Sequence, residues 1–114
     1  MNIRQRPHFR ARIEIFGTEA GGPNQGYFGF PESGMRALPS NFLGVSGLNT
    51  LIMYAEPNLE VRNGSSFEAD CRVLAEEFFT GKIDSGTTFH LWDGRDIARG
   101  QVLELFHDNW GSAA

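Results

Sequence analysis

The sequence predicts an all-β domain, a barrel or a sandwich, from three observations. Apolar and charged side chains alternate with a period of two in several runs, which is the spacing of half-buried strands. The 114 residues include 14 glycines and 10 phenylalanines, a composition that suits short strands and tight turns. No segment shows a convincing helical period. The length allows one domain over residues 1–114, with a core over about residues 7–107 and a frayed tail over 108–114.

The first half of the chain contains one clear strand and one buried strand. Residues 9–15 alternate strictly between apolar and charged side chains, which predicts a half-buried strand. Residues 27–43 contain two prolines and two glycines, so we expect an irregular excursion with one short strand. Residues 45–56 contain the longest apolar run and carry no charge until their end. We favour a core strand buried on both faces there, and the alternative is a strand covered by a partner.

The second half predicts a long strand and a hairpin. Residues 67–75 place five consecutive odd-numbered positions inward, which favours a strand, although residues 68–79 also contain good helix formers. Asn63-Gly64 predicts the turn before this strand. Asp93-Gly94 predicts a hairpin turn between a strand at 87–92 and a returning strand at 96–106.

Composition and motifs exclude several classes of protein. The longest apolar run, residues 51–55, is too short to cross a membrane, and no secretory signal follows the arginines at the start, so we expect a soluble, cytoplasmic protein. A single cysteine, Cys71, excludes an internal disulfide, and its inward position predicts a core role. Neither Gly17–Gly22 nor Thr80–Lys82 has the spacing of a phosphate-binding loop, so we expect no GTP binding.

The remaining polar residues do not predict an enzyme. The three histidines lack metal-ligand spacing, and surface or rim positions are expected for them. The carboxylate pairs Glu76-Glu77 and Asp93 with Asp96 lie at a strand end and around a hairpin turn, where a desolvated acid–base pair is not expected. The sequence therefore predicts no catalytic residue, no cofactor and no metal site.

The start of the chain is the best candidate for contact with nucleic acid. Four of the nine arginines lie in the first twelve residues, and Phe16 continues the same strand face for stacking on bases. The alternative is a solvated strand face balanced by acidic neighbours. We favour this alternative because the formal net charge is −4, and an acidic chain is repelled by phosphates. The candidate residues are Arg4, Arg6, Arg10 and Arg12.

Nearly the whole chain resembles the C-terminal β-barrel domain of elongation factor Tu. Residues 9–15, followed by Thr18-Glu19-Ala20-Gly21-Gly22, are similar to that domain's first strand and its Glu-Gly-Gly loop. Ser33-Gly34-Met35-Arg36 is similar to its Ser-Gly-Tyr-Arg-Pro-Gln segment, and Asn63-Gly64 with residues 67–73 resembles its Pro-Gly-Asp turn and following strand. The most specific match covers residues 86–102, which follow the family's last hairpin in spacing and in most residue types.

The resemblance implies a closed antiparallel barrel of about six strands with Greek-key connections, in which Gly100 allows tight packing. In the full-length factor this barrel contacts the T-arm of aminoacyl-tRNA and packs against a GTPase domain. We therefore expect a non-enzymatic binding module, with protein as its partner and self-association as one form of this. The predicted interface is around the outward-placed apolar residues Met53, Leu74 and Trp92. The alternative is a translation-linked accessory that binds tRNA or other RNA through the N-terminal arginines.

Overall fold

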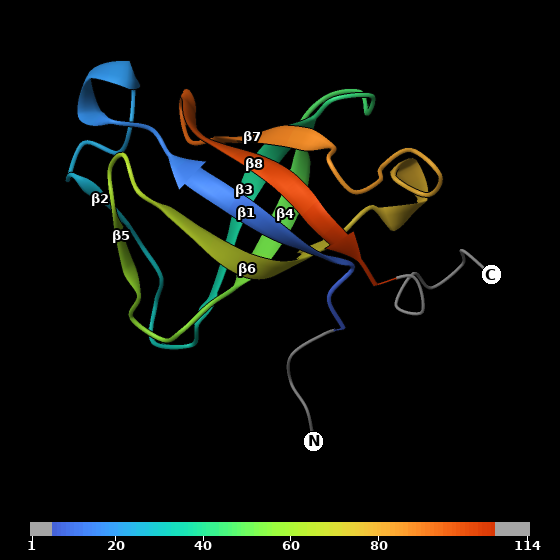
Figure 1. Ribbon diagram of the computed structural model, residues 1–114, viewed down its shortest axis with the longest axis horizontal. Helices are drawn as coiled ribbons and strands as arrows, with labels where there is room; N and C mark the ends of the chain where they lie inside the picture. Colours follow the sequence, from blue (N-terminus) through green and yellow to red (C-terminus); the bar gives the residue numbers. More distant parts are fainter. Residues whose placement is uncertain (1–5, 107–114) are drawn as a thin grey trace.

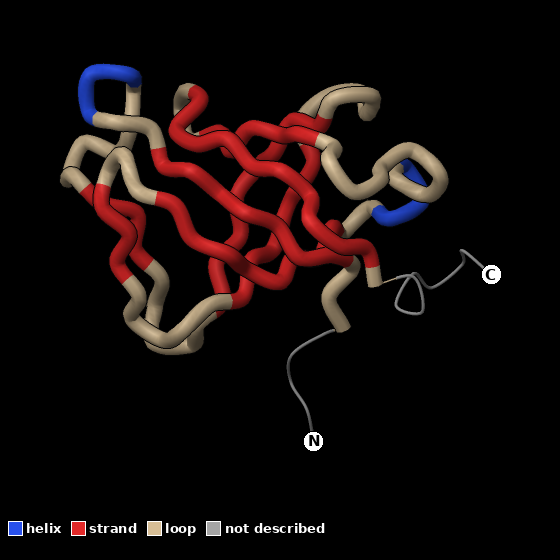
Figure 2. The backbone as a smooth tube through the Cα atoms, viewed as in Figure 1, coloured by secondary structure: helices blue, strands red, loops and turns tan. Residues whose placement is uncertain are grey.

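The computed structural model describes residues 6–106, in which six strands close into an antiparallel barrel (Figure 1). Strands fill most of this range, and the helical content is limited to two short 3-10 turns (Figure 2). The 3-10 turns are η1 (Thr18–Ala20) and η2 (Glu76–Phe78). The strands are β1 (Phe9–Ile15), β2 (Tyr27–Gly29), β3 (Met35–Phe42), β4 (Asn49–Tyr54), β5 (Glu60–Arg62), β6 (Ser66–Val73), β7 (Thr88–Trp92) and β8 (Asp96–Leu105).

The order around the barrel is β1-β6-β4-β3-β7-β8, and β2 pairs with β5 in a separate two-stranded sheet. Because β1 lies beside β6 and not beside β3, the next barrel strand in the sequence, the connections form a Greek key. The prediction of a closed antiparallel barrel of six strands is confirmed. The predicted frayed tail at 108–114 lies outside the described residues.

Four barrel strands lie where the sequence predicted them, β1 and β6 from alternation and β7 and β8 from the hairpin turn. In β1 the burial of side chains alternates at every residue, with the apolar set inside and the charged set outside. In β6 the positions of Ala69, Cys71 and Val73 point inward, so the strand interpretation is right and the helical one is wrong. Gly94, with φ of +77°, closes the β7–β8 hairpin at the predicted turn.

Strand β3 was not predicted, because Pro39 lies in its middle. Pro39 pairs with Thr50 of β4, whereas the pairing of β3 with β7 begins only at Ser40. The proline therefore sits where the ladder to β7 has ended, and the backbone N–H that it lacks is not needed there. An eight-residue barrel strand thus tolerates a proline that, from the sequence, indicated a break.

The inside of the barrel is filled with aromatic rings. Phe42 stacks on Phe89 with 4.5 Å between ring centroids, and Phe9 and Phe79 meet Phe42 edge-on. Gly100 of β8 faces this group, and a Cβ built at that position would overlap the Phe89 ring. The close packing expected at Gly100 is therefore present.

The two ends of the barrel are covered differently. The β2–β5 sheet lies across one end (left in Figure 1), where Phe28 and Phe30 pack on Phe67 of β6. The opposite end carries η2 and the β3–β4 connection (right in Figure 1). This arrangement leaves the outer faces of the barrel strands as the largest exposed surface.

Candidate functional site

The outer surface of the barrel divides into a charged half and an uncharged half. Strands β1, β6 and β8 present both acidic and basic side chains to the outside. Strands β3 and β4, both fully within residues 6–106, present no charged side chain there. We define the uncharged face by the outward residues of these two strands and by two residues at its borders. They are Met35, Ala37, Pro39, Asn41, Thr50 and Ile52, with Leu74 on one side and Trp92 on the other.

The arginines of β1 are balanced by acidic side chains on the neighbouring strands. Arg10 Nε lies 3.3 Å from Asp70 Oδ1, and Arg10 Nη1 lies 3.7 Å from Glu104 Oε1. Arg12 is opposite Glu68 and donates to Ser66 Oγ at 3.3 Å. These contacts are those of a solvated strand face with acidic neighbours, the interpretation that the sequence favoured.

The remaining residues proposed for nucleic-acid contact are Arg4, Arg6 and Phe16. Arg6 is exposed ahead of β1, and Arg4 lies outside the described residues. Phe16 is half-buried, with its ring edge-on to the His90 ring at 6.3 Å between centroids. Of the three candidate arginines within residues 6–106, Arg10 and Arg12 lie on one strand face, and both have polar partners within the fold.

Two of the three residues named for the predicted protein interface are exposed. Leu74 is 55% exposed and Trp92 is 39% exposed. The expectation that Met53 faces outward is wrong, because Met53 is fully buried inside the barrel beside Cys71 of β6. Side chains alternate along a strand, so the outward position in β4 is Ile52, one residue earlier. The same alternation corrects the prediction that this strand is buried on both faces: Thr50 is exposed and Ile52 half-buried.

Leu74 and Trp92 lie at the two ends of one row across the uncharged face. The Leu74 N–H donates to the Thr50 carbonyl oxygen at 3.4 Å, and Thr50 is paired with Pro39. On β3 and β7, Pro39 and Trp92 are the residues next to the paired Ser40 and Leu91. Ser40 and Leu91 point inward, so Pro39 and Trp92 point outward. The row therefore has large side chains at its ends and small ones in its centre.

His8 is buried near the η2 end, where a surface or rim histidine was expected, and is 1% exposed. The Val73 N–H donates to His8 Nδ1 at 3.1 Å, so the ring proton is on Nε2, which lies 2.7 Å from Glu76 Oε2. Burial lowers the pKa of His8, while the nearby Glu76 carboxylate raises it and Arg72 lowers it further. The imidazole thereby links Val73 at the end of β6 to Glu76 at the start of η2, and Leu74 lies between these two residues in the sequence.

Cys71 is buried, as its inward position predicted. Its Sγ lies 3.6 Å from the Ala69 carbonyl oxygen, and burial strongly raises the pKa of the thiol. A buried thiol with a raised pKa is not a nucleophile at neutral pH. Within residues 6–106, no group of three or more His, Cys, Asp or Glu side chains could hold a metal ion.

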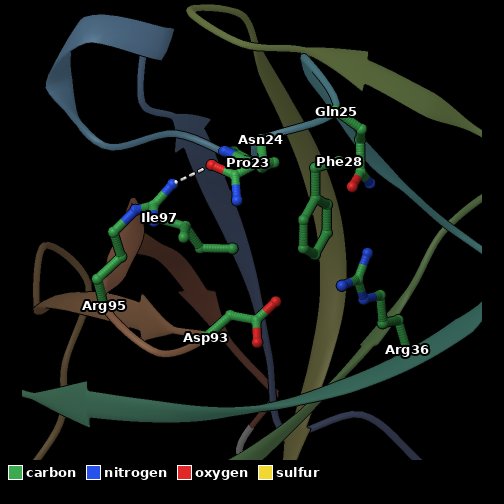
Figure 3. Close-up of a pocket in the computed structure, with 8 residues that line it drawn as sticks. All are labelled: Pro23, Asn24, Gln25, Phe28, Arg36, Asp93, Arg95 and Ile97. Atoms are coloured by element: carbon green, nitrogen blue, oxygen red, sulfur yellow. Dashed lines mark hydrogen bonds between the residues drawn. The ribbon is translucent and has the colours of Figure 1, made fainter.

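A small polar cavity of about 150 Å³ lies where β2, β3 and the β7–β8 hairpin meet (Figure 3). Arg36 stacks on the Phe28 ring at 4.1 Å and donates to the Gly29 carbonyl oxygen at 2.7 Å. Burial lowers the pKa of Arg36, and the Asp93 carboxylate on the other wall raises it. Arg95 is held by the carbonyl oxygens of Gly21 and Gly22 and by Asn24, at 2.8–2.9 Å.

Both arginines of this cavity hold the fold together. Arg36 joins β3 to β2, and Arg95 joins the hairpin to the loop after η1. Sequence reasoning assigned neither residue a role, because both contacts depend on how the elements are arranged in the fold: Gly29 lies on a different strand from Arg36, and Gly21 is 74 positions from Arg95. Glu76 and His8 were missed as a pair for the same reason, since 68 positions separate them.

No protein-family model matches the chain, and no curated protein sequence matches it. No helix among residues 6–106 is long and apolar enough to cross a membrane. The resemblance to elongation factor Tu therefore stays a prediction, and the functional argument rests on the surface geometry.

Proposed function

We propose that the chain is a non-enzymatic binding module that recognises protein through its uncharged face. The resemblance to the C-terminal barrel of elongation factor Tu supports this proposal, because that barrel works by packing on other domains. It also suggests the cytoplasm as the location and translation as the setting. The uncharged face itself is the observation that carries the proposal.

Three features of this face suit a protein partner. It groups Met35, Leu74 and Trp92 as exposed large apolar side chains, and aromatic residues and methionine are enriched in protein interfaces. It also lacks charged residues, which are depleted at the centre of such interfaces. The residues of β3 and β4 are fixed in a closed barrel, so little conformational entropy is lost on binding.

The other functions have weaker support in the described part of the chain. Cys71 is buried, and His8 is occupied by Val73 and Glu76, so neither is arranged to attack a substrate. RNA binding through the arginines would require Arg10 to exchange its two carboxylate partners for phosphates. We keep RNA binding as the alternative function because neither Arg6 nor Arg12 has a carboxylate within 4 Å among residues 6–106.

Affinity capture with matched surface variants tests the proposal. The bait is the full chain, either unchanged or with Trp92→Glu or Leu103→Glu. Trp92 and Leu103 are almost equally exposed, at 39% and 38%, but Leu103 lies on β8 in the charged half. We expect a protein that the unchanged chain and the Leu103 variant retain and the Trp92 variant loses.

Capture of tRNA distinguishes the alternative. Retention of tRNA that declines steeply with salt, and that is lost when Arg6, Arg10 and Arg12 become alanine, would favour RNA binding. A protein retained equally by the Trp92 and Leu103 variants would refute recognition through the uncharged face.

A further inference from the structure

We propose that the uncharged face binds a second copy of this chain, in a symmetric dimer that places Trp92 of each copy on Leu74 and Arg72 of the other. This inference rests on the proposed function and names its partner. It follows from the charges around the face, from the shape of the row across it, and from Arg72 at its border.

The first argument is charge. The chain has a formal net charge of −4, so two copies repel each other, and this repulsion is smallest when their charged groups are kept apart. The outer faces of β3 and β4 carry no charge, and facing them together turns the charged halves away from each other. A phosphate backbone, an anionic membrane or a strongly charged peptide would find no opposite charge on the outer faces of these two strands. A surface of the same uncharged kind fits best, and a second copy supplies one.

The second argument is the shape of the row Leu74–Thr50–Pro39–Trp92. In a symmetric dimer the twofold axis lies in the plane of the interface. An axis along the strands, between Thr50 and Pro39, exchanges the two ends of the row. Each Trp92 then meets Leu74 of the other copy, while the small side chains in the centre let the two sheets approach. The row is therefore complementary to itself.

The third argument concerns Arg72 on the outer face of β6, two residues before Leu74. Arg10 and Arg99 form ion pairs, whereas the Arg72 side chain makes no ion pair or hydrogen bond with any residue that the structure describes. The proposed axis brings Trp92 of the other copy to this end of the row. An arginine over an indole ring is a favourable cation–π contact, and both residue types are enriched among interface hot spots.

The size of the face sets the expected affinity. Two strands and their borders form a surface at the low end of specific interfaces, which gives weak, reversible association. We expect a dissociation constant between about 10 µM and about 1 mM. Apolar contact makes little use of charge attraction, so the dimer should be no weaker in 1 M NaCl, where repulsion between net charges is screened to about 3 Å.

Sedimentation equilibrium of the full chain over this concentration range is the first test. We expect Trp92→Glu to raise the dissociation constant at least about 30-fold, the loss typical of an interface hot spot. Leu103→Glu serves as the control of matched exposure and should leave the dissociation constant unchanged. Circular dichroism of each variant checks that the barrel remains folded.

Cross-linking locates the contact. The only natural cysteine is buried, so a single introduced cysteine can be targeted selectively by a short bis-maleimide. Thr50→Cys lies next to the proposed axis and should link two copies, whereas Gln101→Cys on the outer face of β8 should not. Equal linking at both positions would overturn the proposed geometry.

The outcomes separate this inference from the proposed function. If the chain stays monomeric to about 1 mM and still captures another protein in a Trp92-dependent manner, the dimer is refuted and protein binding through the uncharged face stands. If the chain is monomeric and nothing depends on Trp92, both proposals fail.

Discussion

Substituting Gly100 with alanine tests how tightly the inside of the barrel is packed. A Cβ at Gly100 would overlap the ring of Phe89 on the neighbouring strand. The ring cannot move away, because it stacks on Phe42 at 4.5 Å and meets Phe9 at 6.3 Å. Without this overlap, alanine in place of a strand glycine would stabilise the domain by about 0.5–1 kcal/mol. Overpacking costs about 1–3 kcal/mol, so we expect Gly100→Ala to be clearly destabilising.

Urea unfolding followed by circular dichroism measures the loss in the free energy of unfolding. In thermal unfolding, a loss of about 1 kcal/mol should lower the Tm by about 4 °C in a domain of this size. Gly17→Ala is the control, since a Cβ at Gly17 has no neighbour within 4 Å and its φ of −61° suits alanine. Adding Phe89→Leu to Gly100→Ala should give a combined loss smaller than the sum of the two. A Gly100 variant as stable as the original chain would refute the packing argument.

Three further predictions concern His8, Arg36 and Arg10. Burial holds the pKa of His8 below its usual value of about 6.5, so as the pH falls this imidazole is protonated in the unfolded chain before it is protonated in the folded one. The free energy of unfolding should therefore fall as the pH drops below about 6.5. This fall should be smaller in His8→Asn, which urea unfolding at several pH values would show. Arg36→Met should lower the free energy of unfolding by about 1–3 kcal/mol, and Arg36→Lys should restore only part, because lysine cannot both stack on Phe28 and donate in the same plane. Arg10→Ala should change it by less than about 1 kcal/mol, since its ion pairs are exposed, and a larger loss would show that Asp70 depends on this partner.

The sequence predicted strands well where one face meets the core and the other meets water. In β1 and β6 this difference imposes a period of two on the residue types, so both the strands and their inward sides could be predicted. On β3 and β4 the outer residues are uncharged and the contrast between the two faces is lost. The lack of charged outer residues that makes this surface a candidate interface therefore also led to the wrong placement of Met53, whereas β3 was missed because of Pro39.

The candidate site was also predictable only in part because it joins residues from strands that are far apart in the sequence. Leu74 and Trp92 are eighteen positions apart in the sequence, and only the Greek-key order places β4 and β3 between them. The same reason applies to the arginines of β1. The positive charge that Arg10 offers to a partner depends on Asp70 and Glu104, which come from strands far away in the sequence. Residue types indicate what a side chain can do, whereas the register of the sheet decides which groups it meets.

The division of the barrel surface into a charged and an uncharged half favours protein binding over RNA binding more strongly than the net charge does. A charge of −4 distributed evenly would weaken any contact with phosphates and leave protein binding unspecified. Among the barrel strands, the outward acidic and basic groups lie on β1, β6 and β8, where Arg10 and Arg99 are paired with carboxylates. The outer faces of β3 and β4 offer no cation to RNA, because Arg36, the charged residue of β3, is directed to Phe28 and Gly29. A protein partner is expected on the uncharged half and RNA on the charged half. Trp92 borders the first half and Leu103 lies in the second, and the two side chains are almost equally exposed. The comparison of these two variants therefore tests the function itself, independently of what the partner is.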